Sequence, residues 1–81
     1  MTTWNYQLAH KKHESGVTLY GMVEVYRNKE GEILATTENF VSPNEWDSAG
    51  EVIGTLKMML KDAQEYPVLD LDNLQCLGFD E

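Results

Sequence analysis

The groups able to hold a metal ion gather in one short stretch, His10-Lys11-Lys12-His13-Glu14. A zinc site needs three or four ligands that converge in a tetrahedron. Here two histidines flank two lysines, whose positive charge opposes a cation. A second stretch, Asp70-Leu71-Asp72-Asn73, resembles the opening of a calcium-binding loop, but Gln75 stands where such a loop requires glycine. We therefore expect no bound metal and no cofactor.

The sequence contains no motif for nucleophilic catalysis. There is no Gly-x-Ser-x-Gly turn and no glycine-rich loop that would cradle a phosphate. Cys76, the single cysteine, has acidic and apolar sequence neighbours, which do not favour a reactive thiolate. A single cysteine also excludes an intrachain disulfide, and this favours a reducing compartment. We therefore expect a protein that is not an enzyme.

Charge is unevenly divided along the chain. Fourteen acids and six bases give a net charge of −8, of which residues 1–29 carry +2 and residues 30–81 carry −10. Nucleic acids and anionic membranes bind basic surfaces, so we expect neither as a direct partner. No apolar run reaches the roughly 20 residues of a membrane span, and the start lacks signal-peptide features, so we expect a cytoplasmic protein. The acidic surface suits either simple solubility or docking to a basic protein partner.

The elements that position these groups follow from length and periodicity. Eighty-one residues make one domain. Alternating side chains predict strands over 4–10, over 17–27, and from 32 to about 41. The polar segment 11–16 reads as a turn, and Asn28-Lys29-Glu30-Gly31 reads as a hairpin loop in which Gly31 adopts the left-handed conformation. Ser42-Pro43-Asn44 ends the third strand. We therefore predict a three-stranded antiparallel β-meander.

A register for the second hairpin assigns the two faces of this sheet. If Arg27 lies opposite Glu32, Val25 meets Leu34 and the face of strand 17–27 that holds Val25 is apolar. We place this face in the core; its members are Val17, Leu19, Gly21, Val23 and Val25. The opposite face should point outward, with Tyr26 beside Ile33, Glu24 beside Ala35, and Met22 beside Thr37.

One amphipathic helix follows the strands. Ser48 and Glu51 fit a capping box, and Pro67 ends the helix after Tyr66. The apolar positions at helical spacing form one stripe, which we expect to pack across the core face of the sheet: Ala49, Val52, Ile53, Leu56, Met59, Leu60 and Ala63. The prediction is an α+β fold with a β-β-β-α core over residues 1–70. The acidic and apolar C-terminal segment, residues 71–81, fits both a short strand with a helical turn and a flexible tail.

The outward face is the candidate binding surface. Aromatic residues and methionine with a polar rim are typical of protein interfaces. The candidate residues are Tyr20, Met22, Glu24, Tyr26 and Ile33, with Asp70 and Asp72 as acidic contacts. We expect a small acidic interaction domain that binds a protein partner, and a homodimer through the same face. Two alternatives stay open: a phage or mobile-element inhibitor that occupies a nucleic-acid-binding protein with its acidic surface, and an oligomer that binds or sequesters a small ligand. The C-terminal segment could instead fold back over the outward face.

Several short stretches in a fixed order resemble one family of small uncharacterised bacterial proteins. They are Trp4-Asn5-Tyr6, Glu24-Val25-Tyr26, the 28–31 hairpin, Ser42-Pro43 and Pro67-Val68-Leu69-Asp70. That family opens with a Trp-Asn-Tyr-Arg-Val strand, where this chain continues with Gln7-Leu8-Ala9. The resemblance spans roughly residues 4–70. It implies a similar fold and a bacterial or phage cytosolic setting, and it implies no activity.

Overall fold

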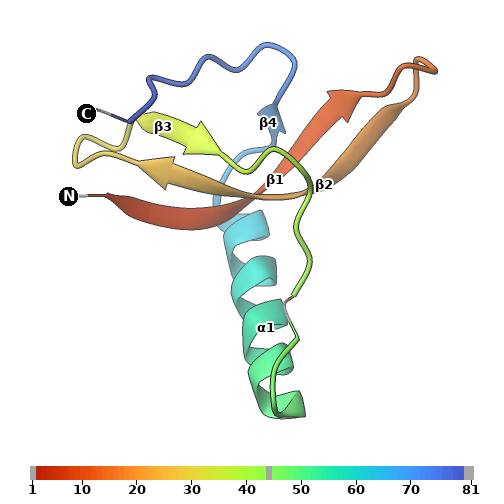
Figure 1. Ribbon diagram of the computed structural model, residues 1–81, viewed down its shortest axis with the longest axis vertical. Helices are drawn as coiled ribbons and strands as arrows, with labels where there is room; N and C mark the ends of the chain where they lie inside the picture. The colour runs from red at the N-terminus through yellow and green to blue at the C-terminus, as the bar shows by residue number, and fades with distance from the viewer. Residues whose placement is uncertain (1, 44, 80–81) are drawn as a thin grey trace.

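The computed structural model describes residues 2–43 and 45–79, and Figure 1 shows their arrangement. Asn44 and the last two residues of the predicted C-terminal segment lie outside the described residues. The elements are β1 (Thr3–Lys12), β2 (Thr18–Arg27), β3 (Ile33–Thr36), α1 (Ala49–Glu65) and β4 (Leu69–Asp70). The α+β class is therefore confirmed. The sheet, however, has four strands in the order β3-β2-β1-β4 and is mixed, because β4 pairs parallel to β1.

Strands β1 and β2 form a long antiparallel hairpin. Thr3 pairs with Arg27 at one end and Lys12 with Thr18 at the other, so all ten residues of each strand take part. The 13–17 turn is closed by a hydrogen bond from His13 N–H to the Val17 carbonyl at 2.7 Å. The loop of the β2–β3 hairpin lies at the opposite end of the sheet (Figure 1). The predicted strands over 4–10 and 17–27 are thus both present, and the first is slightly longer than predicted.

The third strand is shorter than predicted, and its register differs. Val25 pairs with Thr36 instead of Leu34, and a bulge separates the Tyr26–Ala35 pair from the Arg27–Ile33 pair. The loop is one residue longer than predicted because Asn28 N–H bonds the Glu32 carbonyl and its side chain accepts from Glu32 N–H. Beyond Thr36, Thr37 N–H donates to the Glu24 carbonyl, and Val41 forms an isolated bridge opposite Met22.

The longer loop and the bulge together explain which predicted face assignments are correct. The one-residue difference in the loop moves Ile33 opposite Arg27, on the core face, whereas it was predicted beside Tyr26 on the outward face. The bulge adds a second residue, and a shift of two restores the original faces. Val23 and Val25 are accordingly fully buried, as predicted.

The main buried cluster is small and lies on one face of the sheet, and Tyr6 and Met59 are buried outside it. It consists of Ala9, Val23 and Val25, with four half-buried side chains packed against them: Ile33, Phe40, Leu69 and Leu71. Two of these four come from β4 and the residue after it. Residues 71–79 then cross from β4 to β3, where Leu77 N–H and Gly78 N–H donate to the carbonyls of Ile33 and Leu34. The C-terminal segment therefore joins the two edges of the sheet.

Helix α1 begins and ends where the sequence predicts. The Ser48 side chain accepts from Glu51 N–H at 3.3 Å, which is the first half of the predicted capping box. The helix ends at Glu65, one residue before the extended Tyr66 and two before Pro67.

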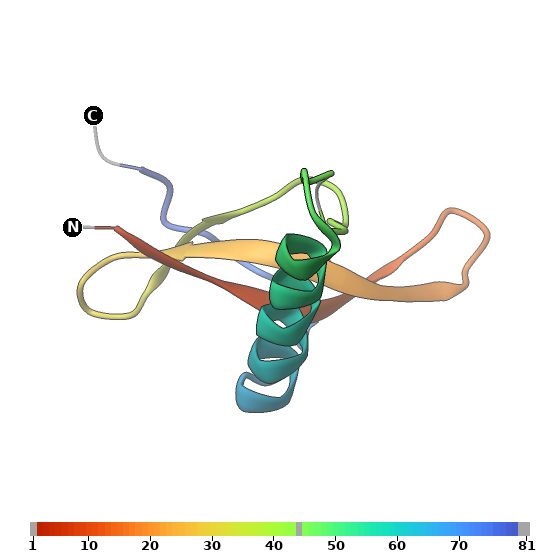
Figure 2. The same ribbon diagram turned by 90° about the horizontal axis from the view of Figure 1, so that it is seen from below.

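The position of the helix differs from the prediction. It does not lie across the core face; it packs mainly on β1 and projects beyond the sheet (Figures 1 and 2). Its last turns are fixed by Asp62, whose carboxylate accepts from Tyr6 N–H at 3.0 Å, and by Gln7, whose amide donates to the Pro67 carbonyl at 2.8 Å. The Asp62 bond satisfies a backbone donor of β1 along the stretch that β4 does not pair. The helix was misplaced because residues 71–79 and Phe40 already cover the core face.

A network of polar side chains holds the helix end to the core face. Arg27 donates from Nε to Asn5 Oδ1 at 3.0 Å and from Nη2 to Gln7 Oε1 at 2.8 Å, and its guanidinium lies 5.4 Å from the centre of the Tyr66 ring. Gln7 is only 1% exposed. Among the described residues, every buried side-chain nitrogen and oxygen has a partner. This satisfied network makes buried amides tolerable beside an apolar core.

Within the described part of the chain, no helix has both the length and the apolar character needed to cross a membrane.

Candidate functional site

The outer face of the β1–β2 hairpin carries a ladder of large side chains. Because alternate residues of a strand point to opposite faces, the antiparallel register brings the even-numbered residues of both strands together. The four cross-strand pairs, which we call the outer ladder, are Trp4–Tyr26, Tyr6–Glu24, Leu8–Met22 and His10–Tyr20. Four of the predicted site residues, those of β2, therefore share one face as expected. Their partners from β1 complete the surface.

The ladder is most exposed at its two ends. Trp4 is 48% exposed at one end and Tyr20 is 65% exposed at the other. The Trp4 ring meets the Tyr6 ring edge-on with centroids 5.0 Å apart, and the His10 ring lies 5.5 Å from the Tyr20 ring. Adjacent rings restrict each other's rotation. A partner would thus meet large aromatic groups whose ordering costs little conformational entropy.

Polar groups inside the ladder are bound to their neighbours. The Tyr26 hydroxyl donates to the Glu24 carboxylate, and this bond, with burial and the Glu24 charge, raises the pKa of Tyr26 above its usual value of 10.0. Burial, followed by the charges of Glu24 and Asp62, likewise raises the pKa of Tyr6. Both phenols are therefore neutral at physiological pH, and the ladder presents one carboxylate among largely apolar groups.

The predicted acidic residues lie beside the Tyr20 end of the ladder. Asp70 pairs with His10 in the β1–β4 register, and the Asp72 carboxylate accepts from Lys12 N–H at 2.9 Å. The Asn73 side chain donates to Asp70 at 2.7 Å, and this bond is the main reason that the pKa of Asp70 falls below its ordinary value. These residues also line a shallow hollow of about 450 Å³ with Thr18. Asp70 and Asp72 thus shape a turn at this end.

Ile33 does not belong to the candidate surface. It packs against the buried cluster on the opposite face, because the longer loop places it beside Arg27. The C-terminal segment does not replace it across the ladder as a whole. Among its described residues, Phe79 lies near the ladder, with its ring 6.1 Å from the ring of Tyr26.

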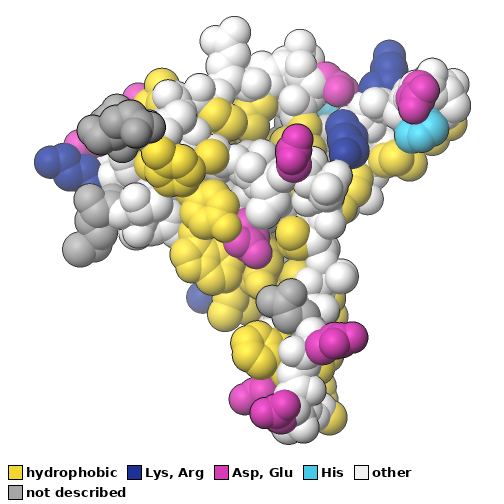
Figure 3. All heavy atoms as spheres, in the orientation of Figure 1, with side chains coloured by type: hydrophobic (Ala, Val, Ile, Leu, Met, Phe, Trp, Pro, Cys, Tyr) yellow, Lys and Arg dark blue, Asp and Glu magenta, His cyan; other side chains and the backbone are white. Residues whose placement is uncertain are grey.

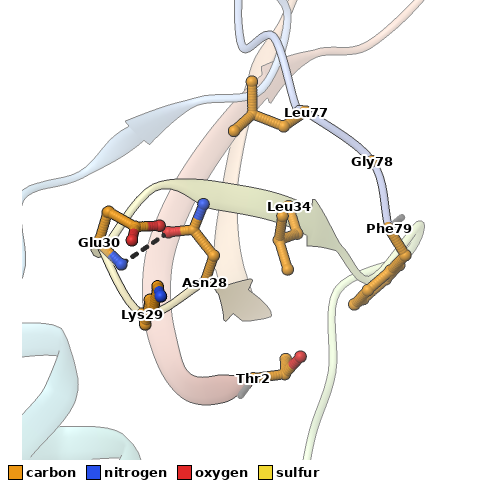
Figure 4. A pocket seen from close by; sticks show the side chains of 8 residues that line it. All are labelled: Thr2, Asn28, Lys29, Glu30, Leu34, Leu77, Gly78 and Phe79. Carbon is orange, nitrogen blue, oxygen red and sulfur yellow. Dashed lines mark hydrogen bonds between the residues drawn. The ribbon is translucent and has the colours of Figure 1, made fainter. Parts of the chain in front are cut away.

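A second hollow, of about 440 Å³, opens at the other end of the sheet, next to Phe79 (Figure 4). Its residues come from the N-terminus, the β2–β3 loop, β3 and the C-terminal segment: Thr2, Asn28, Lys29, Glu30, Leu34, Leu77, Gly78 and Phe79. Inside it, Asn28 Oδ1 accepts from Glu30 N–H at 3.1 Å, which is a bond that shapes the loop. Lys29 and Glu30 are exposed. The hollow brings together no group of side chains with a recognisable catalytic role.

In residues 2–43 and 45–79, no three His, Cys, Asp or Glu side chains gather closely enough to hold a metal ion. The His13 ring at the hairpin tip instead bonds Ser15, with Nδ1 at 3.0 Å from the hydroxyl and accepting from Ser15 N–H at 3.2 Å. The free thiol of Cys76 is exposed.

Sequence reasoning missed the four members of the outer ladder that come from β1, which are Trp4, Tyr6, Leu8 and His10. The signal was present in the alternation of Trp4, Tyr6 and Leu8, but joining them to β2 required the register of the first hairpin. The 13–17 turn fixes that register, since Lys12 and Thr18 flank it.

No protein-family model matches the chain, and no curated protein and no solved structure matches it either. The family resemblance drawn from the order of short stretches therefore stays a prediction.

Proposed function

We propose that this chain is a non-enzymatic interaction domain that binds a protein partner through the outer ladder. The observation that carries the proposal is the row of mostly large, apolar side chains in the outer ladder, whose ends at Trp4 and Tyr20 are exposed, while Tyr6 is buried and the other members are half-buried. Exposed aromatic and methionine side chains that lie together are typical of binding surfaces. Trp4 and Tyr20 are the anchors, because Trp and Tyr dominate the binding energy of protein interfaces.

The partner should present apolar groups beside basic ones. Glu24 lies within the ladder, and Asp70 lies beside its Tyr20 end. The net charge of −8 adds a field that attracts a basic surface from a distance. Binding should therefore weaken as salt rises, because exposed charges are screened over about 8 Å at physiological ionic strength.

Two neighbouring residues of β2 provide a matched test. Tyr20 points to the outer ladder, whereas Leu19 is 39% exposed and points to the opposite face of the same strand. The immobilised chain is used to capture proteins from a bacterial lysate, identified by mass spectrometry. A specific partner should be lost with Tyr20→Ala and kept with Leu19→Ala. Equal capture by both variants would contradict the proposed surface.

Nucleic acid supplies the counter-test. Lys11 and Lys12 lie near one hairpin end and Arg27 and Lys29 near the other, so these bases do not form one stripe. We expect no gel shift with a random-sequence duplex or RNA at micromolar protein and near-physiological salt. A shift under those conditions would contradict the proposal of a basic protein partner.

A further inference from the structure

The apolar stripe of helix α1 is split between two environments. The side of α1 that packs on β1 holds the buried Met59 and the half-buried Val52 and Ala63. The remaining apolar positions of the stripe are exposed: Ala49, Ile53, Leu56 and Leu60. We call these four residues the α1 seam. Ile53, Leu56 and Leu60 are 51%, 49% and 60% exposed, and they lie within an arc of about 60°, since each residue turns an α-helix by about 100°.

The spacing of the seam is that of a helix–helix contact. Positions 49, 53, 56 and 60 follow in steps of four, three and four, which is the a/d pattern of coiled coils. No charged residue interrupts it. Figure 3 shows hydrophobic side chains continuing from the junction with the sheet along the helix. A free-standing helix of 17 residues has no reason to keep such a seam.

The exposed area of the whole chain is larger than that of a compact protein of this mass. A compact protein of this mass exposes about 5,000 Å², whereas this chain exposes 6015 Å², an excess of about 1,000 Å². Its radius of gyration is 13.7 Å, against about 11.7 Å for a compact domain of this length. A stable interface buries about 800 Å² on each partner. The excess over the whole chain is therefore large enough to include a contact of that size.

We propose that a second copy of this chain docks on the α1 seam, so that two α1 helices pack against each other about a two-fold axis at Leu56. A symmetric contact needs one self-complementary patch, and an apolar seam centred on Leu56 is such a patch. The contact is separate from the outer ladder and does not rest on the partner-binding proposal.

Charge sets the direction of the two helices. Glu45, Asp47 and Glu51 lie at or just before the free end of α1, whereas Lys57 and Lys61, the two bases of residues 30–81, lie toward the sheet. Parallel helices would bring the two acidic ends together. Antiparallel helices separate the two acidic ends, and the helix dipoles then oppose each other. The two helices are therefore antiparallel.

Two substitutions of equal charge test the contact. Leu56→Glu places a carboxylate on the axis, whereas Met58→Glu places one on nearly the opposite side of the helix, at a residue of similar exposure. By light scattering after size exclusion at tens of micromolar, the parent and Met58→Glu should have the mass of a dimer and Leu56→Glu that of a monomer. Circular dichroism should show that both variants keep the helix, since both residues are about half exposed. A monomeric parent, or a dimeric Leu56→Glu, would overturn the proposal.

Cross-linking tests the direction. In a Cys76→Ser background, cysteines introduced at Leu56 face each other across the axis and should form a disulfide on mild oxidation. Cysteines introduced at Ala49 lie about 21 Å apart in antiparallel helices, seven residues on either side of the axis, and should not cross-link. Parallel helices would cross-link at both positions, which would overturn the antiparallel arrangement. A Leu56→Glu variant that is monomeric but still captures the protein partner would show that the dimer contact is separate from the partner surface at Tyr20.

Discussion

Replacing Gly21 with alanine adds one methyl group where strand β2 has no room for it. A Cβ atom at this position would lie 2.4 Å from Cγ and 2.6 Å from Cδ1 of Phe40. These atoms are at the base of the ring, so a small rotation does not clear them, and Lys11 Nζ lies 5.0 Å from the centre of the same ring. Phe40 would have to leave its place against the core.

The cost follows from two opposing effects. Overpacking a well-packed site costs about 1–3 kcal/mol, whereas replacing glycine by alanine within a strand gains roughly 0.5–1 kcal/mol. The net loss of unfolding free energy thus lies between about 0 and about 2.5 kcal/mol. Because the three nearest atoms belong to one ring and all lie too close, we expect the upper half of this range. Each kcal/mol lowers Tm by roughly 4–8 °C in a domain of this size. Thermal melts followed by circular dichroism, all at one protein concentration, measure it.

The same substitution in helix α1 is the control. A Cβ at Gly54 would meet nothing within 4 Å, and alanine in a helix interior is about 1 kcal/mol more favourable than glycine. Gly54→Ala should therefore raise Tm while Gly21→Ala lowers it. A Gly21→Ala variant as stable as the parent would refute the packing of Phe40 on β2.

Three further predictions concern buried or hydrogen-bonded polar groups. Arg27→Lys should cost about 1–3 kcal/mol in denaturant titrations, because an ammonium does not reproduce the forked donors and leaves the buried Gln7 amide under-bonded. The raised pKa of Tyr6 favours its neutral form in the folded state, so stability should fall as pH rises above 10.0, and Tyr6→Phe should flatten that fall in melts between pH 9 and pH 11. Because the pKa of Asp70 is lowered in the folded state, its carboxylate stabilises the fold at pH values above the ordinary pKa of 3.8, and this stabilisation is lost as the pH falls further. Asn73→Ala should therefore raise that pKa in a carboxyl NMR titration, and an unchanged value would contradict the bond.

Local rules determined most elements of this fold. The alternation in β2, the left-handed Gly31 at φ 85° and the Ser48 cap each depend on near neighbours, and each lies where the sequence predicts. The outer face of β2 was predictable for the same reason. A strand pattern gives the period of two, and the β2 half of the ladder needs nothing more.

Long-range choices were not predictable from these patterns. The residue pattern of β1 does not predict that the amides of Asn5 and Gln7 face the core, because their burial depends on hydrogen bonds from Arg27 on the neighbouring strand. A loop one residue longer than predicted reversed the face of Ile33. The helix stripe predicts an amphipathic helix without naming the surface on which it packs. Leu69 and Leu71, after Pro67, lie on the core face of the sheet, where the helix was predicted.

The parallel pairing of β4 with β1 has a consequence for how the chain folds. Ala9 pairs with Leu69, sixty residues further along, whereas the β1–β2 hairpin closes through a five-residue turn. Bringing the ends of a sixty-residue loop together costs roughly 3.6 kcal/mol of chain entropy, plus a constant, before the contact is rewarded. The hairpin should therefore form early, with Val23 and Val25 still open to water, and the arrival of β4 should limit the rate. The time spent in that half-covered state, more than the final stability, would then decide how readily this protein aggregates while it folds.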